Sequence, residues 1–302
     1  MTNFITIASV SQLHNLLGFG KPKHPLITVI DYSKISSLPE WVNVRIVSDF
    51  YTVTLKTPSP VGLLYGRQPF DFDSGTMIFT APSQVIYVSE DNSEVQFSGW
   101  GLWFHPELIR RTKLSDTIRQ HEFFKYAINE ALHVSNEEEQ MLSLVLRNIE
   151  CELLSGIDQF SQSVLVTAIE QLLNYTQRYY SRQFATRNNQ NVDYFSRFEK
   201  LLDTYLNSDN LPSNGLPDVK FFADQLNLSP GYLTEILKRE TGKTAKEIIL
   251  LELVEKAKLM LLNSSQTISE ISFQLGFENP SYFSRLFRKK VGMAPLEFRG
   301  LN

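Results

Sequence analysis

Apolar residues recur at helical spacing near the end of the chain, between Thr267 and Arg299. They mark two helical faces, Ile268, Ile271 and Leu275 on the first and Phe283, Leu286 and Phe287 on the second. Gly276 stands between these faces, where a residue in the left-handed conformation commonly ends a helix. Asn279 and Pro280 follow as a cap and a first helical residue. The pattern predicts two short helices joined by a tight turn, with Pro280 at the start of the second.

An earlier segment repeats this pattern. The run QLNLSPGYLTEILKRETGKTAKEI, from Gln225, matches QLGFENPSYFSRLFRKKVGMAPLEF, from Gln274, apart from one extra residue in the second turn. It predicts an earlier copy of the same two-helix arrangement. The segment between the copies, Thr244 to Leu262, favours a helix roughly 28 Å long at 1.5 Å per residue. Such a spacer would hold two recognition helices about one DNA turn, roughly 34 Å, apart, so that they meet successive major grooves.

Short runs rich in β-branched and aromatic residues fill the chain between Pro25 and Phe104, separated by Pro, Gly, Asp and Ser. The runs are LITVID, VNVRIVSDFYTVTL, GLLYGR, GTMIFTA, QVIYV and GWGLWF. They predict a small barrel or sandwich of strands. From Pro106 onward the pattern predicts helices. These include HEFFKYAINEALHVS, a helix that starts at the cap residue Ser135, and a helix from Gln159 to Tyr180.

Composition narrows the class of protein. The 302 residues are 42% hydrophobic and 21% charged, as in ordinary globular domains, with a formal net charge of −4. From Asn191 onward there are fourteen Lys and Arg and fourteen Asp and Glu, so affinity for nucleic acid must come from local placement of cations. The single cysteine, Cys151, excludes an internal disulfide and favours a cytoplasmic location. We expect no signal peptide and no membrane span.

The segment LGFENPSYFSRLFRKKVGMAPLEFR resembles the C-terminal signature of the AraC/XylS family of bacterial transcription regulators. The resemblance extends from Asp193 to Arg299, and YGRQPFDFDSGTMIFTAPSQ is similar to the cupin-like core of these regulators. It implies an α+β fold: a cupin-like β-barrel with trailing helices, then an all-α domain with two helix-turn-helix units joined by a linker helix. The expected domains are residues 1–184 for sensing and dimerisation, 185–192 as a polar linker, and 193–302 for DNA binding.

The resemblance also implies where the two recognition helices run, Pro230 to Thr241 and Pro280 to Lys290, and which side chains meet DNA. Base-reading positions would be Gly231, Thr234, Glu235 and Lys238 in the first recognition helix and Ser281, Arg285 and Arg288 in the second. Phosphate contacts would come from Tyr232, Arg239, Tyr282, Ser284, Lys289 and Lys290. An arginine can make paired hydrogen bonds to guanine, and a glutamate can accept one from cytosine N4. Phosphate contacts position the protein on the duplex without specifying sequence.

A transcription regulator, specifically an activator, is the function that these features favour. Its expected partners are double-stranded promoter DNA, RNA polymerase and a small-molecule effector, with a homodimer formed through the 159–180 helix. Interface helices and core helices have the same periodicity, so the pattern leaves open whether this helix packs internally. Alternatives from other classes are a cupin-type enzyme or small-molecule binding protein with a helical interaction tail, and a helical adaptor that contacts only proteins.

Catalysis and metal binding are not expected. A metal site needs three or four converging ligands, and no two histidines are paired as HxH in a predicted strand. The histidines are His14, His24, His105, His121 and His133. Asp71, Asp73 and Glu90 flank predicted turns, where Asp is favoured for backbone reasons. We therefore expect no catalytic residue, no metal and no cofactor.

Aromatic residues of the predicted strands offer two interpretations. Tyr65, Trp100 and Trp103 would line an effector pocket in the first domain, or would pack in its core.

Overall fold

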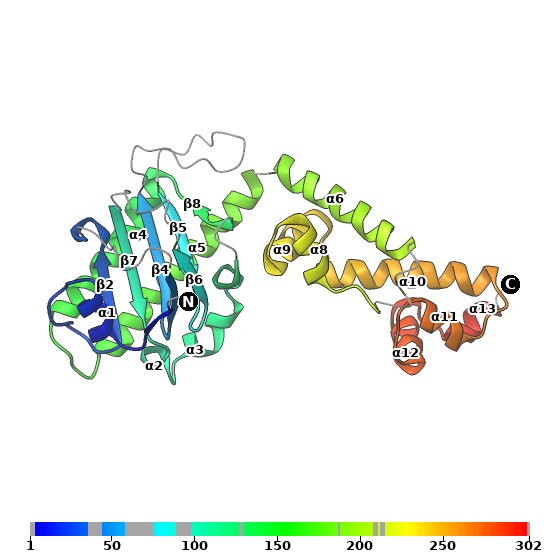
Figure 1. Cartoon of the computed structure of the whole chain (residues 1–302), viewed down its shortest axis with the longest axis horizontal. Coiled ribbons are helices and arrows are strands. Elements are labelled where there is room, and N and C mark those ends of the chain that lie inside the picture. The colour runs from blue at the N-terminus through cyan, green and yellow to red at the C-terminus, as the bar shows by residue number, and fades with distance from the viewer. Residues whose placement is uncertain are drawn as a thin grey trace. The chain divides into compact units, whose positions relative to one another are not determined.

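The chain divides into two compact units, Met1–Thr186 and Arg187–Asn302 (Figure 1). A computed structural model describes residues 4–35, 44–57, 75–88, 98–126, 130–186, 188–207, 211 and 215–300. The division falls inside the segment 185–192, which the sequence predicts to be a linker. Helix α6 (Asn188–Asn207) already includes the last five residues of that segment.

Two sheets form the framework of the first unit. β1 (Phe4–Ile7), β3 (Val44–Ser48) and β6 (Val85–Val88) make a three-stranded sheet. A five-stranded antiparallel sheet has the order β2 (Ile27–Asp31), β7 (Ser98–Phe104), β4 (Tyr51–Thr57), β5 (Thr76–Thr80) and β8 (Leu132–His133). The mixed α+β class is therefore confirmed. No described strand belongs to both sheets, so a closed cupin-like barrel stays a prediction.

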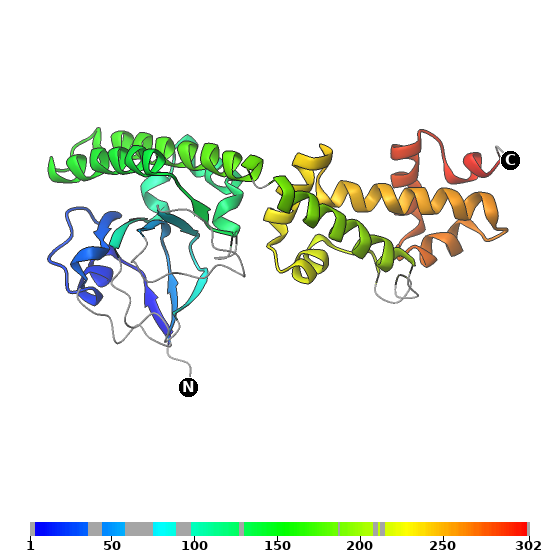
Figure 2. The ribbon, with the colours of Figure 1, turned by 90° about the horizontal axis from the view of Figure 1, so that it is seen from above.

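Two long helices cover one face of the five-stranded sheet. Val53 of β4 lies opposite Leu102 of β7, and both side chains are fully buried. Trp100 is on the same face, and its Nε1 donates to Ser143 Oγ of α4 (Asn136–Leu154) at 3.3 Å. Helix α5 (Ser161–Thr186) packs beside α4, as Figure 2 shows from above. The alternation of side chains along each strand thus gives the sheet a face for these helices.

A second cluster of buried side chains lies around β1 and α1 (Val10–Leu16), two elements that the strand and helix patterns did not predict. Trp103 belongs to this cluster, with 8% of its surface exposed. Trp100 is equally buried, at 9%. Of the two interpretations of the aromatic residues, the core interpretation fits both tryptophans. Tyr65, Asp71, Asp73 and Glu90 lie outside the described residues.

The helix predicted over HEFFKYAINEALHVS is wrong. Residues Glu122–Lys125 form only a 3₁₀ turn, and Leu132–His133 form the edge strand β8. Met77 and Thr76 of β5 pair with this strand. All residues from Ala131 to Val134 are buried, so the periodicity of the segment reflects two-sided burial at the sheet edge and not one face of a helix. Short helices α2 (Pro106–Ile109) and α3 (Lys113–Thr117) precede it.

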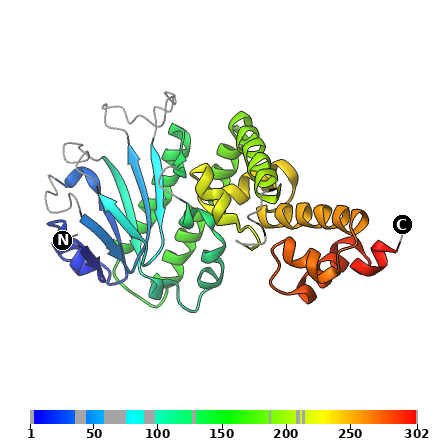
Figure 3. The ribbon, with the colours of Figure 1, turned by 45° about the vertical axis from the view of Figure 1, so that its right-hand side comes forward.

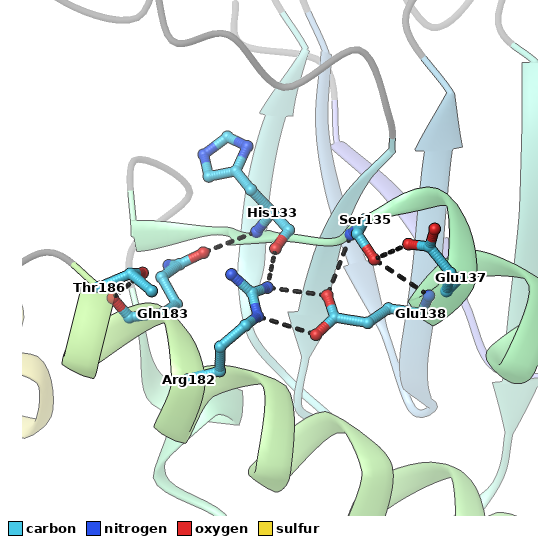
Figure 4. Close-up of polar contacts among 7 residues, drawn as sticks. All are labelled: His133, Ser135, Glu137, Glu138, Arg182, Gln183 and Thr186. Carbon is cyan, nitrogen blue, oxygen red and sulfur yellow. Dashed lines mark hydrogen bonds and ion pairs between the residues drawn. The ribbon is translucent and has the colours of Figure 1, made fainter.

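Polar side chains at the end of α5 hold β8 and the start of α4 (Figure 4). Arg182 donates to both carboxylate oxygens of Glu138 at 2.8 Å and to the His133 carbonyl at 2.6 Å. Gln183 accepts from the His133 amide at 2.8 Å and donates to the Ala131 carbonyl at 3.1 Å. Glu138 also accepts from the Ser135 amide, which completes the capping box of α4.

Helices alone make up the described part of the second unit (Figure 3). After α6 come α8 (Val219–Leu226), α9 (Pro230–Thr241), α10 (Ala245–Asn263), α11 (Ile268–Gln274), α12 (Pro280–Val291) and α13 (Pro295–Arg299). Helix α10 contacts α9, α11, α12 and α13. Lys256 of α10 donates to the Leu206 carbonyl and to Asn207 Oδ1, which fixes the end of α6. Among the described residues, no helix has the length and apolarity that a membrane span requires.

Candidate nucleic-acid interface

Two helix-turn-helix motifs occur in the second unit of the chain. The first motif consists of α8 and α9. Asn227 ends α8 in the left-handed conformation, with a φ of 56°. The hydroxyl of Ser229 accepts from the Tyr232 amide at 3.2 Å, and Pro230 occupies the first turn of α9. A left-handed C-cap followed closely by a capped helix with proline is a compact way to join two helices at a steep angle.

The second helix-turn-helix motif, α11 and α12, is built in the same way. Gly276 has a φ of 80°, and the Phe277 amide donates back to the Ser272 carbonyl at 3.0 Å. Asn279 Oδ1 then accepts from the Ser281 amide at 2.8 Å to cap α12, again with proline in the first turn. The predicted duplication, both recognition helices and the spacer helix between the two units are therefore present, with bounds within one or two residues of those predicted.

Each recognition helix buries one face in the domain. Leu233, Ile236 and Leu237 of α9 are fully buried. Phe283, Leu286 and Phe287 are the corresponding buried residues of α12, and Phe277 from the turn packs on Phe283 with ring centroids 5.2 Å apart. This burial fixes which face of each helix remains for a partner.

Residues predicted to read bases gather on the opposite face. In α9 these are Gly231, Thr234 and Glu235, each half-buried, and Lys238, which is exposed. In α12 they are Ser281, Arg285 and Arg288, all exposed. Their spacing of three, four and seven residues puts each set along one stripe of its helix. The structure thus brings together the side chains that the resemblance singled out within each helix.

The residues predicted to touch phosphate divide into two groups. Lys289 and Lys290 are exposed, Ser284 is half-buried, and Tyr282 is 43% exposed beside the Phe277 ring. Tyr232, by contrast, is only 4% exposed. It packs inside the domain at the start of α9, and this burial argues against the phosphate contact predicted for its side chain. The helical spacing does not distinguish these two placements, because Tyr232 lies at the border of the buried face.

The two recognition helices differ in net charge. Helix α12 carries four cations, Arg285, Arg288, Lys289 and Lys290, and no carboxylate. Helix α9 carries two cations and two carboxylates, Lys238, Arg239, Glu235 and Glu240. Arg239 Nε lies 3.4 Å from Glu235 Oε1 one turn away, so part of its charge is already compensated. Since phosphate attraction dominates affinity for DNA, α12 has the stronger electrostatic attraction to a duplex.

A capping box begins α11, the first helix of the second helix-turn-helix motif. The helical periodicity of the sequence did not predict it. Thr267 accepts from the Glu270 amide at 3.2 Å, and Glu270 accepts from the Thr267 amide and hydroxyl. These hydrogen bonds from Thr267 lower the pKa of the Glu270 carboxyl. Thr244 and Glu247 form the same box at the start of α10. The signal was available in the sequence, since both pairs fit Thr-x-x-Glu before an apolar run.

Comparison with known proteins agrees with this geometry. Residues 222–300 match a family described as "Helix-turn-helix domain". An uncharacterized transcriptional regulatory protein, YesN of Bacillus subtilis, is 38% identical over 78 residues, which are 25% of this chain and 21% of that protein. The transcriptional activator RhaR of Escherichia coli K12 is 35% identical over 81 residues, 27% of this chain and 29% of RhaR. The matched region thus spans between a fifth and a third of these two relatives.

Among solved structures, the chain is similar to the C-terminal domain of the two-component response regulator yesN from Fusobacterium nucleatum. The identity is 29%, the TM-score is 0.30, and the match covers 33% of this chain and 96% of that domain. The family match over residues 222–300, together with the tandem helix pairs and their shared turn geometry, identifies the C-terminal part of the chain as a helix-turn-helix domain of the AraC type.

Proposed function

We propose that the whole chain is a sequence-specific regulator of transcription that binds double-stranded promoter DNA through α9 and α12. The observation that carries this proposal is the repeated unit in which a buried face is backed by an outward stripe of polar and cationic side chains. A helix with such a stripe fits the major groove of B-DNA. The names of YesN and RhaR as regulators of transcription support the same function.

Helix α12 is the main source of affinity in this proposal. The guanidinium of Arg285 is exposed and forms no hydrogen bond or ion pair with any described residue, so it is available for paired hydrogen bonds to guanine O6 and N7. Ser281 and Arg288 flank it on the same stripe. Lys289 and Lys290, with Tyr282 and Ser284, would bind phosphates and fix the position of the helix on the duplex.

Helix α9 has a smaller and electrically neutral reading face. Gly231 allows a close approach of the backbone, Thr234 and Lys238 can reach base edges or phosphates, and Glu235 can accept from a cytosine amino group. Arg239 would contact phosphate through guanidinium N–H groups other than the Nε–H group that faces Glu235. The two helices together would cover two successive major grooves on one side of the duplex.

The first unit would sense an effector and form the homodimer, and the regulator would act as an activator that contacts RNA polymerase in the cytoplasm. Support for dimerisation comes from exposed apolar side chains at the start of the predicted 159–180 helix and on its neighbour α4. Phe160 is 62% exposed, Val164 46% and Leu144 53%. Farther along α5 the outward positions Thr167, Gln171 and Asn174 are polar, so the dimer contact would be centred on the first turns of α5.

Binding of the full chain to fluorescent promoter duplexes, measured by anisotropy at two stated salt concentrations, tests the proposal. We expect saturable, salt-sensitive binding to a subset of duplexes. Arg285→Ala should weaken binding to them by about 1–3 kcal/mol and relax the preference at one base pair. Arg110→Ala is the matched control, because it removes an exposed arginine from the first unit. Equal binding of every duplex by all three proteins would contradict the proposal.

A further inference from the structure

The two recognition helices can be aligned residue by residue through their caps. Ser229 caps α9 and Asn279 caps α12, and each cap is followed directly by proline. The alignment pairs Glu235 with Arg285, each six residues after its cap. It also pairs Arg239 with Lys289, each ten residues after its cap. The buried residues agree with this alignment, since Leu233, Ile236 and Leu237 correspond to Phe283, Leu286 and Phe287. Glu235 and Arg285 therefore occupy the same place on the two reading stripes.

These equivalent positions carry side chains of opposite charge and opposite hydrogen-bonding capacity. An ionised carboxylate only accepts hydrogen bonds, whereas a guanidinium only donates them. In the major groove, cytosine presents an N4 amino donor, and guanine presents the acceptors O6 and N7. Cytosine and guanine are partners in one base pair. Glu235 and Arg285 are thus suited to the same base pair, approached from its two different bases.

The structure also gives Glu235 a defined direction. Its Oε1 lies 3.4 Å from Arg239 Nε, and the two side chains are 30% and 29% exposed. A carboxylate held in this way can still accept from a cytosine amino group through its remaining lone pairs. Opposite guanine or thymine it would face only acceptor atoms, and this repulsion discriminates against those bases.

We infer that Glu235 is a specificity-determining residue, and that the preferred DNA site has a G·C pair at both equivalent positions, with cytosine facing Glu235 and guanine facing Arg285. The inference rests on the proposed function, because it requires that both helices enter the major groove. The two base pairs lie about one helical turn, roughly 10 base pairs, apart. Arg285 adds affinity at its pair, whereas Glu235 acts mainly by excluding guanine and thymine.

Selection of sites from a library of random duplexes by the full chain tests the inference. The wild type should enrich two G·C pairs about 10 base pairs apart. Glu235→Arg should reverse one of them, so that guanine replaces cytosine on the strand that residue 235 faces. Glu235→Gln should move the same position toward adenine, because glutamine pairs with adenine N6 and N7. We expect each change in base preference to be about tenfold or more.

Glu240→Gln is the matched control. It removes the same charge from the same helix, but Glu240 lies roughly 140° around the helix axis from Glu235 at 3.6 residues per turn. It should leave the base preference of both positions unchanged. Thermal melting of each variant establishes that the domain is folded, and Glu235→Gln, which keeps the size of the side chain, serves if Glu235→Arg does not fold.

The outcomes separate this inference from the proposed function. If the wild type enriches no sequence at all, the proposed function itself fails. If it enriches a site whose composition does not respond to Glu235→Gln or Glu235→Arg, the regulator stands and the role of Glu235 is wrong. A response of equal size from Glu240→Gln would also overturn the inference, because the effect would then come from net charge alone.

Discussion

Gly276 lies so close to Gly215 that a Cβ atom at position 276 would come within 2.8 Å of the Gly215 carbonyl carbon. The Leu211 carbonyl oxygen would be 2.9 Å from the same atom. Both neighbours are backbone atoms, which cannot move aside as a flexible side chain can. The turn of the second helix-turn-helix motif thus packs directly against the backbone of Leu211 and Gly215, two residues that precede α8.

We predict that Gly276→Ala lowers the free energy of unfolding of the second unit by about 2–4 kcal/mol, since a left-handed alanine costs about 1–2 kcal/mol before any overlap is counted. Gly292→Ala is the matched control, because Gly292 is also left-handed, at φ +90°, but has open space around it. It should cost only about 1 kcal/mol. Urea titrations of the two variants measure the difference, and equal losses would mean that the close approach has no energetic effect.

Removal of a phosphate-binding cation should have a different signature from removal of a base reader. Lys289→Ala should weaken binding to all duplexes alike and reduce the slope of log K against log salt by about 0.9. The reason is that one fewer counterion is released when one fewer phosphate is neutralised. Anisotropy titrations over a range of salt concentrations measure the slope. A change in base preference with an unchanged slope would place Lys289 at a base edge instead.

Removal of Arg182 from its ion pair with Glu138 should strongly destabilise the first unit. Arg182→Ala removes three hydrogen bonds and leaves Glu138, whose side chain is only 14% exposed, without its cation. We expect a loss of about 2–4 kcal/mol in the free energy of unfolding. Arg110→Ala removes a pair with Glu107 whose side chains are 65% and 52% exposed, and it should cost at most about 0.5 kcal/mol. Thermal melting compares them, and similar effects would show that the α5 contact is no stronger than a surface pair.

Acid should destabilise the first unit through His24. Burial lowers the pKa of this imidazole, and its Nδ1 accepts from the Leu26 amide at 3.1 Å, which requires the neutral ring on that side. Because the folded pKa is below the unfolded value of about 6.5, the unfolded chain binds the proton more readily. The stabilisation by neutral His24 is therefore fully present above the unfolded pKa of about 6.5, and it is lost as the pH falls through the folded pKa.

Melting temperatures measured between neutral and mildly acidic pH should therefore decline more steeply for the wild type than for His24→Asn. Asparagine keeps an acceptor for the Leu26 amide and does not titrate. Burial also lowers the pKa of His121, so the variant should retain part of the slope. Identical slopes for the two proteins would show that His24 does not contribute.

The helical second unit could be predicted from the sequence because its signals are local. Asn279, Pro280 and Gly276 act on the backbone within a few residues of themselves, so their pattern fixes where helices end and begin. The repeat then supplied the second copy. The burial of Tyr232 could not be predicted, because it depends on which neighbouring helix covers the border of the α9 stripe.

The first unit was less predictable because strand pairing depends on distant segments. The runs around Val53 and Leu102 were identified as strands, but their division between two sheets is decided by contacts far apart in sequence. Leu132 and His133 were assigned to a helix because two residues carry too little periodicity to signal a strand. Pairing with β5 and the hydrogen bond from the His133 amide to Gln183 make these two residues a strand.

The contacts of Arg182 and Gln183 also set a lower limit on the length at which the first unit can be produced by itself. A fragment that stops at residue 181 would lack the side chains that bind the His133 and Ala131 backbone, and the edge of the large sheet would be left with unsatisfied amide and carbonyl groups. Such an edge invites pairing with other chains. A fragment that ends at Thr186, the last residue of α5, retains all of these contacts, so we expect it to give a monodisperse sample.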